Sequence, residues 1–345
     1  MRKTVRFSAI NAKIDNMSSK LLKDDDYIKL CHLDNLSEII SYLQDNTEIG
    51  KYIGNHKLTS EVEKEMQEYK IMNLEKLTHY LSDDYKKFVK AFLYEYEISD
   101  IKKILRVLQK KEGYNTLASK LLIMNRGKNL NIDSDVDIPT FIKSLKNTRY
   151  YRVLQSYQNE ENDVVLFYME MNLDKLYYTT LINASKSFSE EDRRAVKELL
   201  GRKIDLLNIT WIYRGLKYYK LLPEELINFC VLGGCKLGYD DLKKLCYVEN
   251  LDNLIKEIKK SDYAFLFDSE NTDIYMDRRS SRYLYYIAKK EFSRSTFNIG
   301  KFLSYVFLLD FEVKDISAIM ETMRFKISFD ETLKYLVRSY KGSEI

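Results

Sequence analysis

One short pattern occurs three times along the chain, and this repetition constrains the fold more than any other feature. The pattern is an acidic residue, an aliphatic residue, any residue, Asp or Asn, Ile, two free positions and Ile. Its copies occupy residues 97–104, 205–212 and 312–319, so their first residues lie 108 and 107 positions apart. A period of fixed length indicates that one structural unit is repeated along the chain.

A second segment repeats at twice this spacing. Residues 25–36 resemble residues 240–251, since both begin with two aspartates and continue with the same order of apolar positions. The offset between these segments is 215 residues, which equals the offset between the first and third copies of the pattern. A weaker middle copy runs through residues 137–145. We therefore predict three similar helical units, at residues 1–120, 121–231 and 232–345.

Residues that interrupt helices are scarce, with 2 prolines and 11 glycines among 345 residues. A proline inside a helix costs roughly 3 kcal/mol and a glycine about 1 kcal/mol, whereas sheets joined by tight turns need both. Pro223 is followed by Glu224 and Glu225, which predicts the start of a helix there. Because 45% of the residues are apolar and available for a core, we expect an all-α fold.

The aliphatic residues of each copy share one face of a helix, as Ile98, Ile101 and Ile104 illustrate. Apolar residues upstream of each copy lie on a different face. Either a helix ends at the acidic residue and a new one begins, or one long helix is buried on nearly all sides. No proline interrupts any copy and Gly201 weakens only one, which favours the second interpretation.

Polar residues at fixed positions of the pattern then lie beside buried stripes. A buried carboxylate without a partner is too costly, so each needs a hydrogen-bond donor or a cation from a neighbouring helix. These residues form either a catalytic or ion-binding set or a set of structural pins. We favour pins, because a catalytic site has no need of three near-copies so far apart in the chain. The predicted pins are Glu97, Asp100, Asp205, Asn208, Glu312 and Asp315.

Charge and hydropathy argue against two classes of protein. The chain has 56 Lys and Arg against 52 Asp and Glu, a net charge of +4, whereas nucleic-acid binding favours a clustered basic face. No segment approaches the run of about 18 apolar residues that a membrane span needs. We therefore expect a cytoplasmic chain that binds no nucleic acid and does not itself cross a membrane.

Motifs for catalysis and metal binding are missing from the sequence. Gly300 and Lys301 lack the upstream glycine of a phosphate-binding loop. The aspartate pairs at 83–84 and 240–241 miss the third aspartate of the magnesium-binding prenyl-transfer motif. The 4 cysteines show no C-x-x-C spacing, and only 3 histidines are available as further zinc ligands. We predict no catalytic residue, no cofactor and no metal site; an all-α enzyme with an unrecognised site stays an alternative.

Several segments resemble the C subunit of the bacterial and archaeal A/V-type rotary ATPases, which is related to the d subunit of eukaryotic vacuolar ATPases. They are residues 9–14, 21–22, 27–43, 205–214 and 222–225, together with the third copy of the pattern. The resemblance spans essentially the whole chain, and the triplication is its most specific part. The chain departs from this family at Asp315, where asparagine is common, and in the eroded opening of the second repeat.

The resemblance implies a funnel of three helical subdomains around a pseudo-threefold axis. The base of the funnel would cap the cytoplasmic face of the rotor ring of proteolipid subunits, and its open socket would receive the central stalk of D- and F-type subunits. The chain would then be a non-catalytic adaptor, peripheral to the membrane, that transmits torque for proton or sodium transport or for ATP synthesis. Such an adaptor needs no cofactor.

A basic cluster on one predicted helix is a candidate for a polar rim that faces the stalk or the ring. It comprises Arg278, Arg279, Arg282, Lys289 and Lys290. The alternative is a solvated helix face without a partner. For the chain as a whole, the competing function is a helical-repeat scaffold for another protein, for which a period of about 34–47 residues is expected.

Overall fold

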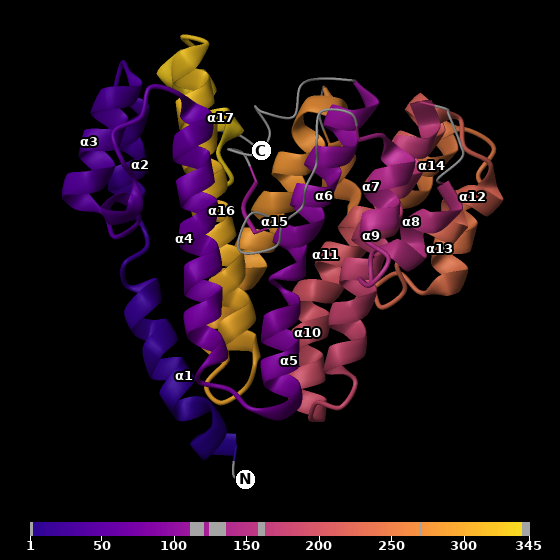
Figure 1. Cartoon of the computed structure of the whole chain (residues 1–345), viewed down its shortest axis with the longest axis horizontal. Helices are drawn as coiled ribbons and strands as arrows, with labels where there is room; N and C mark the ends of the chain where they lie inside the picture. The colour runs from indigo at the N-terminus through magenta and orange to yellow at the C-terminus, as the bar shows by residue number, and fades with distance from the viewer. Residues whose placement is uncertain (1–2, 111–120, 124–135, 158–162, 269–270, 340–345) are drawn as a thin grey trace.

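The computed structural model describes residues 3–110, 121–123, 136–157, 163–268 and 271–339. Within these ranges every regular element is a helix and no strand is present, so the predicted all-α fold is confirmed. The helices are either long and arranged in pairs or short and gathered in clusters (Figure 1).

Three pairs of long helices form the body of the molecule, and we call them hairpins 1, 2 and 3. Their first helices are α4 (Thr59–Thr78), α9 (Asp163–Ser185) and α15 (Thr272–Arg294). In hairpins 1 and 3 the returning helices are α5 (Asp83–Ala91) with α6 (Tyr94–Gln109), and α16 (Gly300–Arg324). In hairpin 2 the returning run is α10 (Glu190–Val196), the π-helical η5 (Lys197–Gly201), α11 (Arg202–Arg214) and the π-helical η6 (Gly215–Tyr219).

A cluster of short helices precedes each hairpin in the chain. The first consists of α2 (Asp24–Cys31), α3 (Leu36–Asn46) and η1 (Ile49–Tyr52). The second consists of α7 (Ile138–Ser144), α8 (Tyr151–Leu154) and η4 (Gln155–Tyr157), and the third of α13 (Tyr239–Cys246), α14 (Leu251–Lys259) and η7 (Ala264–Phe267). The remaining helices are α1 (Lys3–Ser18), α12 (Pro223–Phe229) and α17 (Phe329–Tyr335), so the helix start predicted at Pro223 is confirmed.

Equivalent side chains start equivalent helices in the first and third clusters. The Asn35 side chain accepts a hydrogen bond from the Glu38 amide at the start of α3, and the Asn250 side chain accepts one from the Asn253 amide in α14. An Asn side chain in this position satisfies an amide that has no partner within its helix. Asn35 and Asn250 lie 215 residues apart, the offset found in the sequence. The division at residues 120 and 231 stays a prediction, which this agreement supports.

The helix that carries the repeated pattern is continuous in two copies. α16 runs without interruption through the third copy, and the second copy lies in the run from α10 to η6. Gly201 ends η5 where a Cβ would lie 3.0 Å from the amide nitrogen of Cys235, so close packing explains this glycine. In the first copy the expectation of one long helix is wrong, because Phe92 and Leu93 form a turn with hydrogen bonds to the third preceding residue before α6 begins.

The turns of the three hairpins meet at one end of the molecule, which we call the base (lower end of Figure 1). The hydroxyl of Tyr85 donates to Asp192 Oδ2 at 2.6 Å, and the amide of Ile299 donates to Asp192 Oδ1 at 2.8 Å. Tyr85, Asp192 and Ile299 are successive positions 107 residues apart. Contacts between equivalent positions of repeated units are expected at the axis around which such units are arranged.

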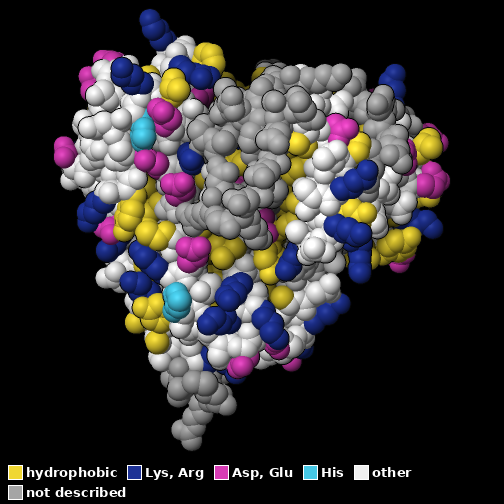
Figure 2. All heavy atoms as spheres, viewed as in Figure 1, with side chains coloured by type: hydrophobic (Ala, Val, Ile, Leu, Met, Phe, Trp, Pro, Cys, Tyr) yellow, Lys and Arg dark blue, Asp and Glu magenta, His cyan; other side chains and the backbone are white. Residues whose placement is uncertain are grey.

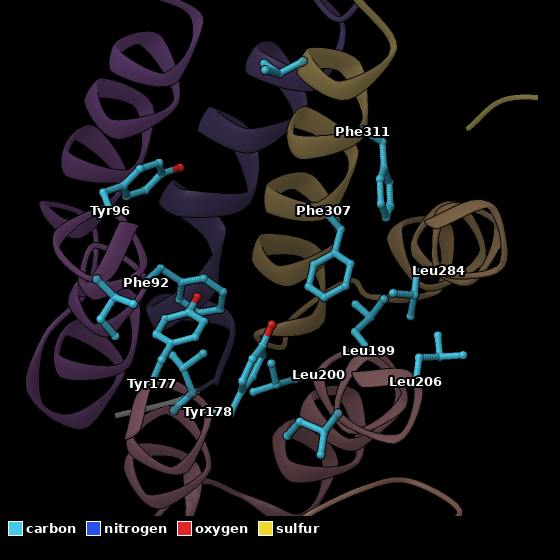
Figure 3. Close-up of a cluster of buried hydrophobic side chains, with 14 of the residues drawn as sticks. Phe92, Tyr96, Tyr177, Tyr178, Leu199, Leu200, Leu206, Leu284, Phe307 and Phe311 are labelled. Carbon is cyan, nitrogen blue, oxygen red and sulfur yellow. The ribbon is translucent and has the colours of Figure 1, made fainter. Parts of the chain in front are cut away.

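Apolar side chains fill the space between the hairpins next to the base. The Phe92 ring packs edge to face on Phe88 and Phe302, with ring centroids 5.4 and 5.5 Å apart. Figure 3 shows Phe92, Leu200 and Phe307, one from each hairpin, directed into this space. All of these side chains are buried, so the base half of the molecule is a closed core.

Candidate functional site

Between the described parts of the hairpins, on the side away from the base, lies a cavity. Its larger part has a volume of about 960 Å³ and is lined by residues of α4, α6, α9 and α16. A second part of about 570 Å³ adjoins it between α9, α11, α15 and α16. Asp174, Tyr178 and Asp310 line both parts, which we together call the central cavity. Small-molecule pockets are mostly apolar, whereas this lining is rich in charged residues.

The floor of the central cavity carries a layer of charged side chains. Lys70 Nζ lies 2.5 Å from Asp310 Oδ1, and Lys314 Nζ lies 3.4 Å from Asp310 Oδ2. Burial acts to lower the pKa of Lys70, but Asp310, Tyr96 and Glu95 together outweigh burial and raise that pKa. Burial acts to raise the pKa of Asp310, yet Lys70, Lys314 and Lys203 together lower it. The layer is therefore charged at neutral pH.

Ion pairs between α6 and α9 form one wall of the central cavity. Lys102 Nζ lies 2.5 Å from Asp174 Oδ1, and burial raises the pKa of Asp174 while Lys102 opposes the shift. Arg106 donates through Nε and Nη2 to the two carboxylate oxygens of Glu170 at 2.6 and 2.7 Å. Paired hydrogen bonds of this kind fix geometry as well as charge, so hairpins 1 and 2 are held in one orientation here.

The second polar position of the repeated pattern binds the backbone of a segment that follows 22 or 23 residues later in all three copies. The three side chains are buried, and each accepts a hydrogen bond from a backbone amide. The acceptor and donor pairs are Asp100 with Leu122, Asn208 with Val231 and Asp315 with Val337, at 2.9, 2.8 and 2.6 Å. The pattern thus positions a polar anchor for the segment that follows each hairpin.

The first acidic position accepts a tyrosine hydroxyl in the first two copies. Tyr150 donates to Glu97, and Tyr263 donates to Asp205 at 2.6 Å. Asp205 also accepts hydrogen bonds from the amides of residues 236 and 237, at 2.7 and 3.2 Å. Burial raises the pKa of Asp205, and these hydrogen bonds oppose the shift. Both acids therefore join a hairpin to the cluster of short helices beside it.

The third copy joins the two ends of the chain. Glu312 accepts a hydrogen bond from the amide of Leu22 at 2.6 Å, and Arg338 donates to the carbonyl of Leu22 at 3.3 Å. Arg338 Nε also lies 3.4 Å from Asp315 Oδ2. Burial raises the pKa of Glu312 to about 7 and that of Asp315 to about 6, although backbone hydrogen bonds and Arg338 oppose both shifts. This junction therefore contains two carboxylates that titrate near neutral pH.

The six predicted pins contact separate segments, so they do not form a single site. Each has a hydrogen-bond donor from another part of the chain. Five of the pins are buried, where the cost of burying a polar group requires such a donor, whereas Glu97 is half-buried. Their contribution to stability stays a prediction.

The basic cluster on α15 is divided between buried and exposed positions. Arg279 and Arg282 are buried, Arg278 donates to the carbonyl of Lys334, and Lys289 and Lys290 are exposed. The acceptors of the buried arginines are the carbonyl oxygens of Leu266 for Arg279 and of Leu336 and Val337 for Arg282, at 2.7, 2.8 and 3.1 Å. The arginines thus hold neighbouring segments against α15, and an interface role for the cluster stays a prediction.

The repeated pattern does not reveal Asp192, Lys70 or Asp310. For Asp192 a signal exists, because its partners Tyr85 and Ile299 lie at the period of the repeat on either side of it. Lys70 and Asp310 are 240 residues apart, and no local pattern connects them.

The described residues offer neither a metal site nor a membrane span. No group of three or more His, Cys, Asp and Glu side chains is placed there to hold a metal ion. No helix in these ranges is both long enough and apolar enough to cross a membrane. The 25-residue helix α16 illustrates the second point, because its charged side chains include Asp310, Glu312 and Lys314.

Comparison with known proteins gives a consistent set of relatives. The sequence model of the ATP synthase (C/AC39) subunit family matches residues 10–335. The chain is 22% identical over 327 residues to the C subunit of the A-type ATP synthase of Methanosphaera stadtmanae. The aligned region covers 91% of this chain and 83% of the relative. It is 25% identical over 336 residues to the protein of the same name from Methanocaldococcus jannaschii, with coverage of 91% and 82%. The matched region includes all three hairpins.

Proposed function

Because the chain belongs to the ATP synthase (C/AC39) subunit family, we propose that it is a subunit of a rotary A/V-type ATPase. Within that complex it is a non-catalytic adaptor that links the central stalk to the membrane rotor ring. It transmits torque between them and so couples ATP hydrolysis or synthesis to the transport of protons or sodium ions. One observation carries the proposal: three hairpins close on one another at the base and leave a cavity between them at the other end.

A torque-transmitting body has to resist deformation, and bonds between hairpins supply that resistance. Asp192 binds donors from hairpins 1 and 3, and Lys70 of hairpin 1 pairs with Asp310 of hairpin 3. The contact of Glu312 with Leu22 ties the C-terminal hairpin to the N-terminal segment. Because close-packed interiors have low compressibility, these links support the arrangement of three units around a pseudo-threefold axis.

The two ends of the molecule fit two different partners. The central stalk, built from D- and F-type subunits, enters the central cavity, whose charged lining favours recognition by electrostatic complementarity. The base covers the ring of proteolipid subunits on the cytoplasmic face of the membrane, so the chain is peripheral to the membrane. Stable contacts of this kind bury more than about 1,000 Å² in total.

Copurification tests the proposal. A tagged chain, isolated from detergent-solubilised membranes of cells that express it, is expected to bring down both the stalk subunits and the ring subunits. Mass spectrometry of the eluate identifies them. Recovery of the chain without either group of subunits contradicts the adaptor function.

A pair of matched variants separates the two ends. Ser99 lines the central cavity on α6, whereas Ser37 is exposed on α3. Ser99→Trp narrows the cavity and is expected to lose the stalk subunits while keeping the ring subunits. Ser37→Trp adds the same side chain outside the cavity and is expected to keep both. Retention of the stalk by Ser99→Trp at the wild-type level argues against entry of the stalk into the cavity.

A further inference from the structure

Three lysines surround one aspartate at the floor of the central cavity. Asp310 forms ion pairs with Lys70 and Lys314, whose Nζ atoms lie 2.5 and 3.4 Å from its carboxylate oxygens. Lys203 also acts on Asp310 electrostatically. The ammonium group of Lys203 lies over the aromatic rings of Phe307 and Tyr178, 5.3 and 5.8 Å from their centroids. One carboxylate therefore faces cations from all three hairpins.

Around Asp310 the lysines outnumber the carboxylates, and Lys203 also forms a hydrogen bond with the Tyr178 hydroxyl. Glu95 acts on both Lys70 and Lys203, and it accepts a hydrogen bond from Tyr177 at 3.2 Å. Asp174 is occupied by Lys102 on the cavity wall. In the part of the chain that the structure describes, no carboxylate lies within ion-pair distance of Lys203. The floor layer thus sets three lysines against Asp310 and Glu95.

The position of Lys203 in the repeat explains why it faces the cavity. Tyr96, Lys203 and Asp310 are separated by 107 residues, so they occupy equivalent positions in the three hairpins. In the proposed threefold arrangement they lie around the same axis as Tyr85, Asp192 and Ile299, 11 residues further along the chain in each hairpin. Figure 3 shows the hydroxyl group of Tyr178 directed toward Phe307. Lys203 is the cation that hairpin 2 contributes to this layer.

We propose that Lys203 binds a carboxylate at the tip of the stalk segment that enters the central cavity. This inference rests on the proposed function, because that function supplies the stalk as the occupant. One carboxylate, from an acidic side chain or from a chain end, brings the floor layer to neutrality. The part of the central cavity that Lys203 lines has a volume of about 570 Å³ and charged residues on α9, α11, α15 and α16. It suits a protein segment better than a free anion, which leaves most of that volume unfilled.

The affinity of the chain for the stalk should depend on the charge of the Lys203 side chain rather than on its shape. Removing one partner of a charge pair that is shielded from water leaves the other partner uncompensated. The loss of affinity from such a change is about tenfold or more. An arginine keeps the charge, whereas a glutamine keeps much of the length and removes the charge.

The test measures binding of the purified stalk subcomplex to the purified full-length chain by calorimetry. Lys203→Gln is expected to raise the dissociation constant about tenfold or more, and Lys203→Arg is expected to stay within about threefold of wild type. Lys260→Gln is the matched control, because Lys260 is exposed on the third cluster, where it pairs with Glu257. Rising ionic strength should weaken binding of the wild type more steeply than binding of Lys203→Gln.

The outcomes separate the two proposals. Equal affinity of Lys203→Gln and wild type, with parallel salt dependence, overturns the carboxylate site and leaves the adaptor function standing. Failure of the wild-type chain to bind the stalk at all contradicts the adaptor function itself. If sodium phosphate or sodium acetate raises the melting temperature of wild type but not of Lys203→Gln, while stalk affinity is unchanged, the site takes a free anion and the inference is wrong.

Discussion

The second and third copies of the repeated pattern bury the same positions with different charges. In the second copy Asn208 is neutral, and Asp205 is surrounded by two amides and the Tyr263 hydroxyl. In the third copy both positions are carboxylates, and Arg338 is the cation beside them. The target of the second position, a backbone amide 22 or 23 residues further on, is the same in both copies. The pattern therefore determines which segment is held, and the residue types determine whether the junction titrates near neutral pH.

The largest expected effect is that of removing the acid of the second copy. Asp205→Ala leaves the hydroxyl of Tyr263 and the two amides without their acceptor inside the protein. Because each buried donor left unsatisfied costs about 1–3 kcal/mol, we expect a loss of roughly 3–5 kcal/mol in the free energy of unfolding, measured by urea denaturation. Asp252→Ala, at an exposed position of α14, is the control and should change stability by less than about 0.5 kcal/mol. Unchanged stability of Asp205→Ala would show that the second copy does not need its acid.

A pH titration tests the charge difference of the third copy. The pKa of Glu312 is raised in the folded protein, so the folded state binds this proton more tightly than the unfolded chain does. Its contribution to stability is full below the ordinary pKa of glutamate and is lost as the pH rises through about 7. Between pH 5 and pH 8 the wild type should therefore lose about 1–3 kcal/mol relative to Glu312→Gln. Asp315 is present in both proteins, so its own titration largely cancels in this comparison.

Urea denaturation of both proteins across this pH range provides the measurement. Parallel pH profiles would mean that Glu312 does not titrate in this window. The second and third copies would then differ in their hydrogen-bond partners but not in their titration near neutral pH.

A smaller effect is expected from the glycine beside Asp205. A Cβ at Gly234 would lie 1.9 Å from Asp205 Oδ1, whereas a Cβ at Gly238 would meet its nearest atom at 3.5 Å. Gly234→Ala therefore forces Asp205 or the loop to move and should cost about 1–3 kcal/mol. Gly238→Ala is the matched control, with an expected change below about 0.5 kcal/mol, and thermal unfolding of both variants provides the measurement. Equal melting temperatures for the two variants would show that the loop adapts freely around Asp205.

The sequence predicted the features that depend on local preferences and on spacing. The all-α class followed from the scarcity of helix breakers, and the start of α12 followed from Pro223 with its acidic neighbours. Burial of Asp205 and Glu312 followed from their places beside apolar stripes. These inferences needed only the helical period and the cost of burying charge.

Features that depend on distant segments were out of reach. The turn at Phe92 and Leu93 reflects how hairpin 1 packs, since neither residue is a helix breaker. From the sequence, Arg282 was expected at the surface as part of a basic cluster. It is buried instead, because carbonyl groups of the C-terminal segment accept its hydrogen bonds. The pairing of Lys70 with Asp310 joins residues from opposite ends of the chain. Much of the charged lining of the central cavity was for this reason not predictable.

The surface seen in Figure 2 carries interspersed Lys, Arg, Asp and Glu side chains around the hydrophobic ones, in keeping with the near balance of 56 basic and 52 acidic residues. Such a mixed surface does not by itself identify a partner. The internal geometry of the described residues, with a packed base and a cavity between the hairpins at the other end, is what distinguishes the two ends.

An electron cryomicroscopy map of the complex purified through a tag on this chain tests the central claim most directly. The account predicts density for a stalk segment inside the central cavity, reaching Lys203, and density for the rotor ring against the base formed around Asp192. A map in which the central cavity is empty of other subunits, or in which the base faces solvent, would contradict it.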